Sequence, residues 1–208
     1  MSGDSRITPV SPLGLMNRIL NTSMLSPAPF SSSSSPASYS VKLVDHTGSD
    51  ASWLDGLEKK IQSVFDECMK GSSHKVVVSW GKGVATDNLV LHFVQDVDHS
   101  YIQQKMPGAP IKEDIGGHTR TQGKVVGSEI YKLAGPRGDR RQHTYTGYSK
   151  LALHESLHNL YNWWSDSQLH GSLGGGGLAA AVPQLPPTAL NKELIQRGLN
   201  IKTKDQLL

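Results

Sequence analysis

The chain has 208 residues, which is enough for one hydrophobic core of ordinary size and too few for two. Its net charge is only +3, and its one basic cluster, residues 137–141, lacks interleaved aromatic residues, so nucleic acid is not an expected partner. No segment approaches about 18 consecutive apolar residues, which excludes a predicted transmembrane helix and membrane insertion, and the single cysteine, Cys68, excludes an internal disulfide.

The first 38 residues are rich in serine and proline and include the run Ser31 to Ser35. Such a composition buries too little apolar surface to offset the entropy of ordering, so we predict a disordered leader at 1–38 and a folded domain at 39–208. The apolar patch at 13–20 is interrupted by polar residues, unlike the core of a cleaved signal peptide. Two locations stay open: secretion without a cleaved signal, in the manner of an effector, or the cytoplasm.

The folded part begins with an alternation of apolar and polar residues over 39–44, which predicts a half-buried strand. Apolar residues then recur at spacings of three and four over 51–70, which predicts an amphipathic helix that ends at Gly71. Two short apolar runs, 75–80 and 89–94, predict the next two strands.

The second half of the domain is less regular. Residues 95–123 are rich in Gly, Pro and polar side chains and are predicted as loop, with at most a short edge strand, and 124–133 is a further strand candidate. A helix is predicted over about 149–164 and another over 188–197. The apolar stripe of the first of these comprises Leu153, Leu157, Leu160 and Trp164. The predicted fold class is therefore mixed α/β, of the α+β type, with a helix packed on a small mixed sheet.

The helix predicted at 149–164 contains an H-E-x-x-H sequence, whose ends are His154 and His158. Residues four apart lie one turn apart on the same face of a helix, so both imidazoles can reach one cation. Glu155 lies about 100° around the helix and can act on water beside that cation without ligating it. The motif predicts Zn²⁺ as cofactor, the two histidines as ligands and Glu155 as the general base.

A catalytic zinc site needs a third protein ligand and an open fourth position. Asp166 and His170 follow the motif closely, and glycines at 171 and 174–177 let the chain turn back. Imidazole suits zinc well, which favours His170 over Asp166, and Glu193 on the last predicted helix is a more distant candidate. A donor to the oxyanion is also needed, and the candidates are His143, Tyr145, Tyr148 and Tyr161.

The seven residues from His154 to Leu160 resemble the active-site helix of zincin metallopeptidases, and the Asn-Leu that ends them is similar to metzincins. The predicted order of strands and helices is also similar to the upper subdomain of metzincins, in which an edge strand lines the substrate cleft. The resemblance implies zinc bound by His154 and His158, Glu155 as general base, and hydrolysis of peptide bonds in a protein or peptide substrate.

The sequence departs from metzincins after the second histidine. Metzincins have glycine three residues later and a third ligand six residues later, where this chain has Tyr161 and Trp164. No methionine follows Met106, so the methionine turn of metzincins is missing too. The resemblance therefore does not identify the third ligand.

Two other functions fit the same residues. In the first, His154, His158, His170 and Asp166 together close a structural zinc site, and the protein is a non-catalytic module that binds a partner. In the second, the enzyme is an amidase that hydrolyses a cell-wall peptide. The sequence does not give the oligomeric state.

Overall fold

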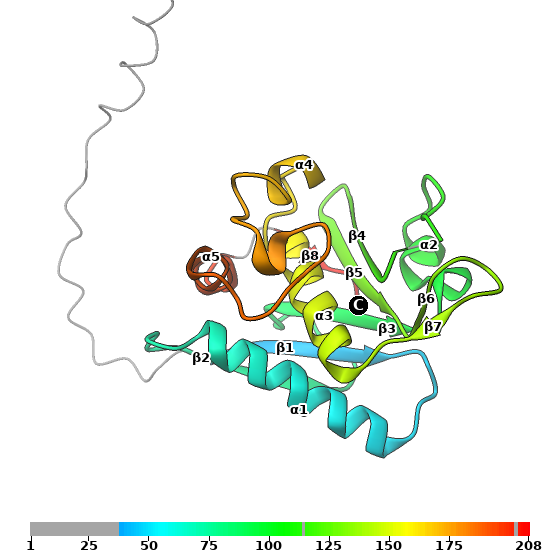
Figure 1. The fold of residues 1–208 in the computed structure, drawn as a ribbon, viewed down its shortest axis with the longest axis horizontal. Coiled ribbons are helices and arrows are strands. Elements are labelled where there is room, and N and C mark those ends of the chain that lie inside the picture. The colour runs from blue at the N-terminus through cyan, green and yellow to red at the C-terminus, as the bar shows by residue number, and fades with distance from the viewer. Residues whose placement is uncertain (1–37, 114, 202–203) are drawn as a thin grey trace, which may run out of the picture. The chain divides into compact units, whose positions relative to one another are not determined.

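The computed structural model describes residues 38–113, 115–201 and 204–208. Its main sheet has six strands, in the order β2-β1-β3-β5-β4 with β8 also paired to β5 (Figure 1). These strands are β1 (Ser38–Asp45), β2 (Lys75–Trp80), β3 (Leu89–Val94), β4 (Gly117–Gln122), β5 (Val125–Tyr131) and β8 (Asp205–Gln206). All pairings are parallel except that of β4 with β5, so the predicted mixed α/β class is confirmed at this level.

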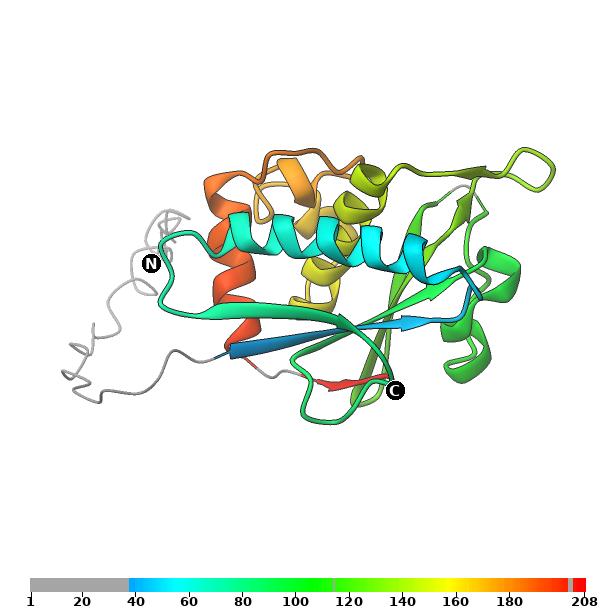
Figure 2. The ribbon, with the colours of Figure 1, turned by 90° about the horizontal axis from the view of Figure 1, so that it is seen from below.

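Three helices lie on one side of the sheet (Figure 2). They are α1 (Ala51–Cys68), α3 (Tyr145–Leu160) and α5 (Ala189–Leu199). Helix α3 contacts both α1 and α5 as well as strands β3, β4 and β5, so it is the central element of the core. Among the residues that the structure describes, no helix has the length and apolar character needed to cross a membrane. The leader predicted at 1–38 lies outside the described residues, apart from Ser38, the first residue of β1.

The predicted elements with strong periodicity are present. Helix α1 begins where the side chain of Asp50 accepts a hydrogen bond from the backbone N–H of Trp53. The apolar residues of α1 pack into the core, and all six residues of β3 are buried, as expected for a strand in the middle of a parallel sheet.

The segment predicted as loop at 95–123 is more ordered than its composition suggests. It contains the 3-10 turn η3 (Val97–His99), the short helix α2 (Tyr101–Lys105) and the full six residues of β4. Tertiary contacts provide the order: the buried carboxylate of Glu129 accepts hydrogen bonds from Ser100 and from the backbone of Ile102, and β4 pairs with β5 along its whole length.

Helix α3 is shifted from its predicted bounds. It starts at Tyr145 because the side chain of Thr144 caps it, accepting a bond from the backbone N–H of Gly147. It ends at Leu160, so Trp164 lies beyond the helix and stacks on Tyr161, with ring centroids 4.4 Å apart. The other three members of the predicted stripe are buried in the core as expected.

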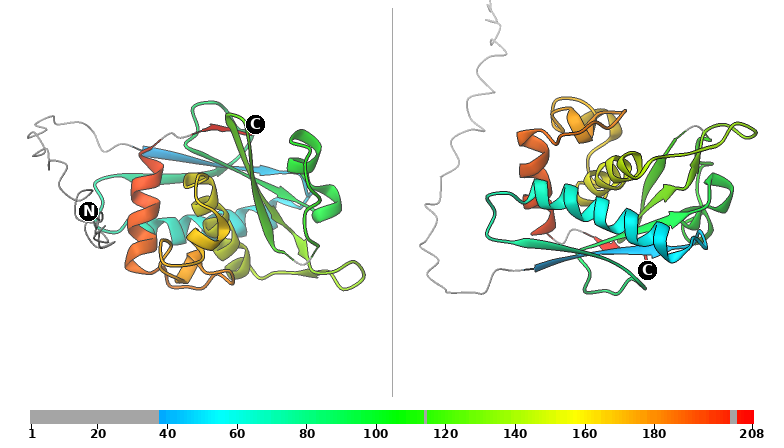
Figure 3. Two further views of the ribbon diagram at one scale, coloured as in Figure 1. Left: turned by 90° about the horizontal axis from the view of Figure 1, so that it is seen from above. Right: turned by 60° about the horizontal axis from the view of Figure 1, so that its bottom comes forward.

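The remaining elements are short or lie near the C-terminal end. The hairpin of β6 (Leu133–Ala134) and β7 (Arg141–Gln142) projects beyond the start of α3 (Figure 3). Helix α4 (Asp166–Leu169) and the 3-10 turn η4 (Gly177–Ala179) follow α3. Helix α5 continues through Gly198 to Leu199, two residues beyond the predicted end. The glycine packs inside the helix interface, where a Cβ would lie 2.9 Å from Leu160 Cβ.

Candidate metal centre

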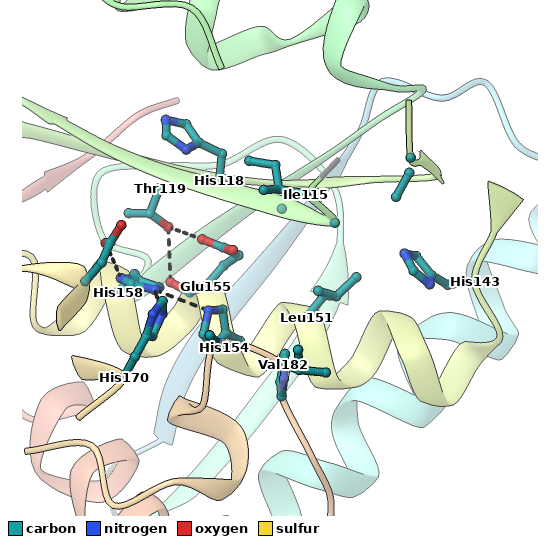
Figure 4. Close-up of a pocket in the computed structure, with 17 residues that line it drawn as sticks. Ile115, His118, Thr119, His143, Leu151, His154, Glu155, His158, His170 and Val182 are labelled. Atoms are coloured by element: carbon teal, nitrogen blue, oxygen red, sulfur yellow. Dashed lines mark hydrogen bonds and ion pairs between the residues drawn. The ribbon is translucent and has the colours of Figure 1, made fainter. Parts of the chain in front are cut away.

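Three imidazoles converge beside helix α3, and we call them the histidine triad: His154, His158 and His170 (Figure 4). The first two come from successive turns of α3, and His170 directly follows α4. The Nε2 atom of His158 lies 3.2 Å from that of His154 and 3.1 Å from that of His170. These three residues therefore lie close enough together to bind one metal ion.

The spacing within the triad fits a tetrahedral cation. Two nitrogens on an ion with zinc–nitrogen distances of about 2.0 to 2.1 Å are separated by roughly 3.3 Å, close to the separations measured here. The Nδ1–H of His154 donates a 2.7 Å hydrogen bond to the backbone carbonyl of Leu178, which leaves its Nε2 lone pair facing the other two rings. The three imidazoles are therefore spaced as metal ligands are, and His154 already makes the hydrogen bond that orients its ring toward the ion.

Burial keeps the imidazoles of α3 neutral. Burial lowers the pKa of His158 to about 4, helped by the neighbouring His154. Burial also lowers the pKa of His154, against the opposing effect of its bond to Leu178. Neutral imidazole is the form that ligates metals, so both residues are ready to bind a cation at neutral pH.

Local structure explains how His170 returns to α3. The side chain of Ser165 caps α4 in a capping box with Gln168, and Leu169 is buried in the core, which fixes the direction of the turn. Gly174 permits the chain to fold back on itself, because a Cβ at this position would lie only 1.9 Å from the carbonyl oxygen of Leu169.

The other two candidates for the third ligand lie elsewhere. Asp166 stands on the opposite side of the His158 ring, with its Oδ1 3.7 Å from Nδ1, and its side chain is 85% exposed. Glu193 forms an exposed ion pair with Arg197 on α5. Neither belongs to the group of metal-binding geometry found among the described residues, and the Asp166 carboxylate faces the His158 nitrogen that points away from the other two rings. The inclusion of Asp166 in the ligand set stays a prediction.

Glu155 is buried beside the triad. Its Oε2 accepts a 2.7 Å hydrogen bond from the hydroxyl of Thr119 on β4. Burial raises the pKa of Glu155 to about 8, and the bond from Thr119 opposes that shift. A carboxyl group with its pKa in this range is poised for proton transfer near neutral pH.

The triad and Glu155 line one cavity of about 490 Å³ (Figure 4). Its other walls come from β4 and the two residues before it, from the β6–β7 hairpin and the residue after it, from α3 and α4, and from the segment after η4. These residues are Ile115, Gly116, Gly117, His118, Thr119, Ala134, Gly135, His143, Leu151, Asp166, Ala181, Val182 and Pro183. The cavity thus joins a metal-binding group, a carboxyl group and an edge strand.

Of the four predicted oxyanion donors, only His143 lines the cavity. The hydroxyl of Tyr148 donates to the carbonyl of Lys132, and that of Tyr161 donates to the carbonyl of Leu194. Tyr145 packs against α1 next to Trp53. The sequence also gave no hint of His118, a second cavity histidine, whose pKa burial lowers to about 4.

Gly117 makes room for the side chain of Glu155. A Cβ at this position would lie 2.9 Å from Glu155 Oε1 and 2.9 Å from the carbonyl oxygen of Glu129. We expect Gly117→Ala to lower the free energy of unfolding by about 1 to 3 kcal/mol, as overpacking of a close contact does. Urea denaturation measures this effect, with Thr121→Ala on the exposed part of the same strand as control. A Gly117→Ala protein as stable as the control would contradict the crowding argument.

The chain was also compared with known proteins. No protein-family model matches this sequence, and no match is found among curated proteins. A function for this chain therefore rests on the chemistry of the site itself.

Proposed function

We propose that the protein is a zinc-dependent peptidase of the zincin type. The observation that carries the proposal is the histidine triad beside a buried carboxyl group, Glu155, on the wall of one cavity. The H-E-x-x-H motif on a helix places its two histidines on one face and the glutamate next to them, and His154, His158 and Glu155 lie in this way.

The donor set of the triad suits zinc. Three imidazole nitrogens are a common ligand set for catalytic zinc, and carboxylate-rich sites favour harder cations instead. When bound, zinc would polarise the scissile carbonyl and make water more acidic. A cation held by the triad would also favour the charged form of Glu155, against the effect of burial on its pKa.

The chain's own residues supply the proton transfers. Glu155 accepts a proton from the attacking water and delivers it to the leaving amine nitrogen, while Thr119 holds one of its oxygens. Strand β4 ends the order of the main sheet, so its outer edge has backbone groups available to pair with an extended peptide. Gly117, His118 and Thr119 of this strand line the cavity, which supports a peptide as the substrate. An edge strand that lines the substrate cleft is also what the resemblance to metzincins implies.

A closed structural site is less well supported. That site needs a fourth protein ligand, and the carboxylate proposed for it, Asp166, approaches the outer nitrogen of His158, away from the other two rings, and its side chain is 85% exposed. The cavity that the triad lines has space for a substrate, which a closed structural site does not need.

Metal binding by single variants tests the proposal. We expect the protein to bind one zinc ion, and His170→Ala to weaken zinc affinity by at least about 100-fold, because it removes a ligand. Asp166→Ala should weaken it no more than about 10-fold, as outer groups do, and Glu193→Ala should not change it. Competition with a chromophoric chelator measures these affinities.

Hydrolysis is measured in parallel with the zinc-loaded protein. Labelled casein and peptidoglycan fragments are the two substrates, which separates a protein peptidase from a cell-wall amidase. Loss of zinc in Asp166→Ala but not in His170→Ala, or absence of hydrolysis of both substrates by the zinc-loaded wild type, would refute the proposal.

A further inference from the structure

A chain of polar side chains runs from the general base to β8. The hydroxyl of Thr119 lies 2.7 Å from Glu155 Oε2, and Ser128 Oγ lies 2.8 Å from Thr119 Oγ1. Asn159 Nδ2 then lies 3.0 Å from Ser128 Oγ. Asn159 and Gln206 form a reciprocal amide pair, with N–O distances of 3.1 and 2.9 Å. Four separate elements, β4, β5, α3 and β8, contribute to this chain, which we call the β8 relay.

A backbone group fixes the orientation of the amides in the β8 relay. The backbone N–H of Val90 donates a 3.1 Å bond to Gln206, so an oxygen, Oε1, must face it. The Nε2 of Gln206 then faces Asn159 and requires the Oδ1 of that residue. The Nδ2 of Asn159 is therefore the group that faces Ser128, and it can only donate.

The ionised carboxylate sets the direction of the two hydroxyls. It can only accept, so the one proton of Thr119 goes to Glu155, and the bond between Thr119 and Ser128 then requires the proton of Ser128. Ser128 in turn accepts from Asn159. Both hydroxyls also lie 3.4 to 3.5 Å from the backbone oxygen of Glu155, but the shorter and better bonds follow the relay. One donor of each member thus leads toward the carboxylate, while the second N–H of Asn159 returns to Gln206 Oε1. In such a series each hydrogen bond strengthens the next.

Two middle members of the β8 relay, and the carboxyl group at its end, are shielded from water. Ser128 is fully buried, Asn159 is 1% exposed and Glu155 is 4% exposed. Groups at such positions have no solvent to replace a lost partner, so removing one member leaves the next one unsatisfied. Gln206 and Thr119 are half-buried, so a change at β8 reaches the carboxylate through the shielded amide of Asn159 and hydroxyl of Ser128.

We propose that Gln206 of β8 is a positioning residue that orients Glu155 through Asn159, Ser128 and Thr119. The inference rests on the proposed function, since orientation of the base matters only if Glu155 transfers protons. Deletion of this one amide should lower the rate of hydrolysis without changing the metal ligands, although Gln206 itself is absent from the wall of the cavity.

Kinetics of the full-length, zinc-loaded protein with labelled casein tests the relay. Thr119→Val should lower kcat about 10-fold with KM and zinc affinity unchanged, and Thr119→Ser should restore kcat, because it keeps the hydroxyl. Gln206→Met, which keeps the size of the side chain, should lower kcat about 3- to 10-fold. Lys204→Ala is the control: it removes a hydrogen bond to Gly123 that holds the same segment but is not in the relay.

Double substitution distinguishes positioning from general destabilisation. If Gln206 acts through Thr119, adding Gln206→Met to the Thr119→Val protein should lower kcat by less than about 2-fold. An equal loss in both backgrounds would overturn the relay.

A spectroscopic measurement makes the relay testable without hydrolysis. In protein labelled with ¹³C at glutamate carboxyl groups, Glu155→Gln identifies the signal of Glu155. We expect Gln206→Met to shift this signal in the same direction as Thr119→Val, and Lys204→Ala to leave it in place. An unmoved signal in Gln206→Met would overturn the relay even if the protein is a peptidase, and a moved signal in a protein that hydrolyses neither substrate would refute the function alone.

Discussion

Replacement of Glu155 by Gln is expected to lower kcat about 1,000-fold while zinc affinity changes less than about 2-fold. Glutamine has the shape of glutamate and can still accept the hydrogen bond from Thr119, but it cannot take a proton from water. The measurement combines casein hydrolysis by the zinc-loaded variant with chelator competition. This pair of results separates loss of the base from loss of the metal.

The fold of Glu155→Gln should stay intact. Because burial raises the pKa of Glu155, a neutral amide in its place should leave the free energy of unfolding at pH 7 unchanged or higher. Glu193→Gln is the control, since this glutamate pairs with Arg197 on the surface and should affect neither property. Undiminished hydrolysis by zinc-loaded Glu155→Gln would remove Glu155 from the mechanism.

Replacement of Asn191 by Ala is expected to destabilise both the domain and the metal centre. The side chain of Asn191 is fully buried, and its Oδ1 accepts bonds from the backbone N–H groups of Leu178 and Thr188. Its Nδ2 donates to the carbonyls of Gly174 and Gly176. Alanine leaves these buried groups without partners, so the free energy of unfolding should fall by about 3 kcal/mol or more.

The same variant should weaken zinc binding. Asn191 holds the backbone of Leu178, whose carbonyl accepts the bond from His154 Nδ1, and loss of such an outer contact weakens metal affinity by about 10- to 100-fold. Urea denaturation and chelator competition measure the two effects. Asn200→Ala is the control, because that amide lies at the end of the same helix and accepts one bond from Tyr39. Normal zinc affinity in Asn191→Ala would show that the position of the Leu178 carbonyl does not depend on Asn191.

The sequence determined the elements whose signals are local. Helix α1 and strands β2 and β3 follow from apolar periodicity, because burial on one side or both sides leaves a regular pattern in the chain. Strand β4 carries no such pattern, since its residues are mostly glycine, threonine and other polar types. Only pairing with β5 gives it its length, and pairing is a property of two segments.

The relation of His154, His158 and Glu155 was also determined by the sequence, because helix geometry alone places residues four apart on one face. Ligand chemistry favoured His170 over Asp166, and only the tertiary structure brings His170 within 3.1 Å of the Nε2 of His158. The two residues lie at opposite ends of α4, and the buried Leu169 holds the end that carries His170 against the core.

The partners of the site could not be found from the sequence. Thr119 is 36 residues from Glu155 along the chain, and Gln206 is 47 residues from Asn159. In the sequence, a threonine, an asparagine or a glutamine that lies on the surface cannot be told from one that lies in a buried chain of hydrogen bonds. Their roles arise only when folding removes water and brings distant donors and acceptors together, because a hydrogen bond depends on the position of both partners.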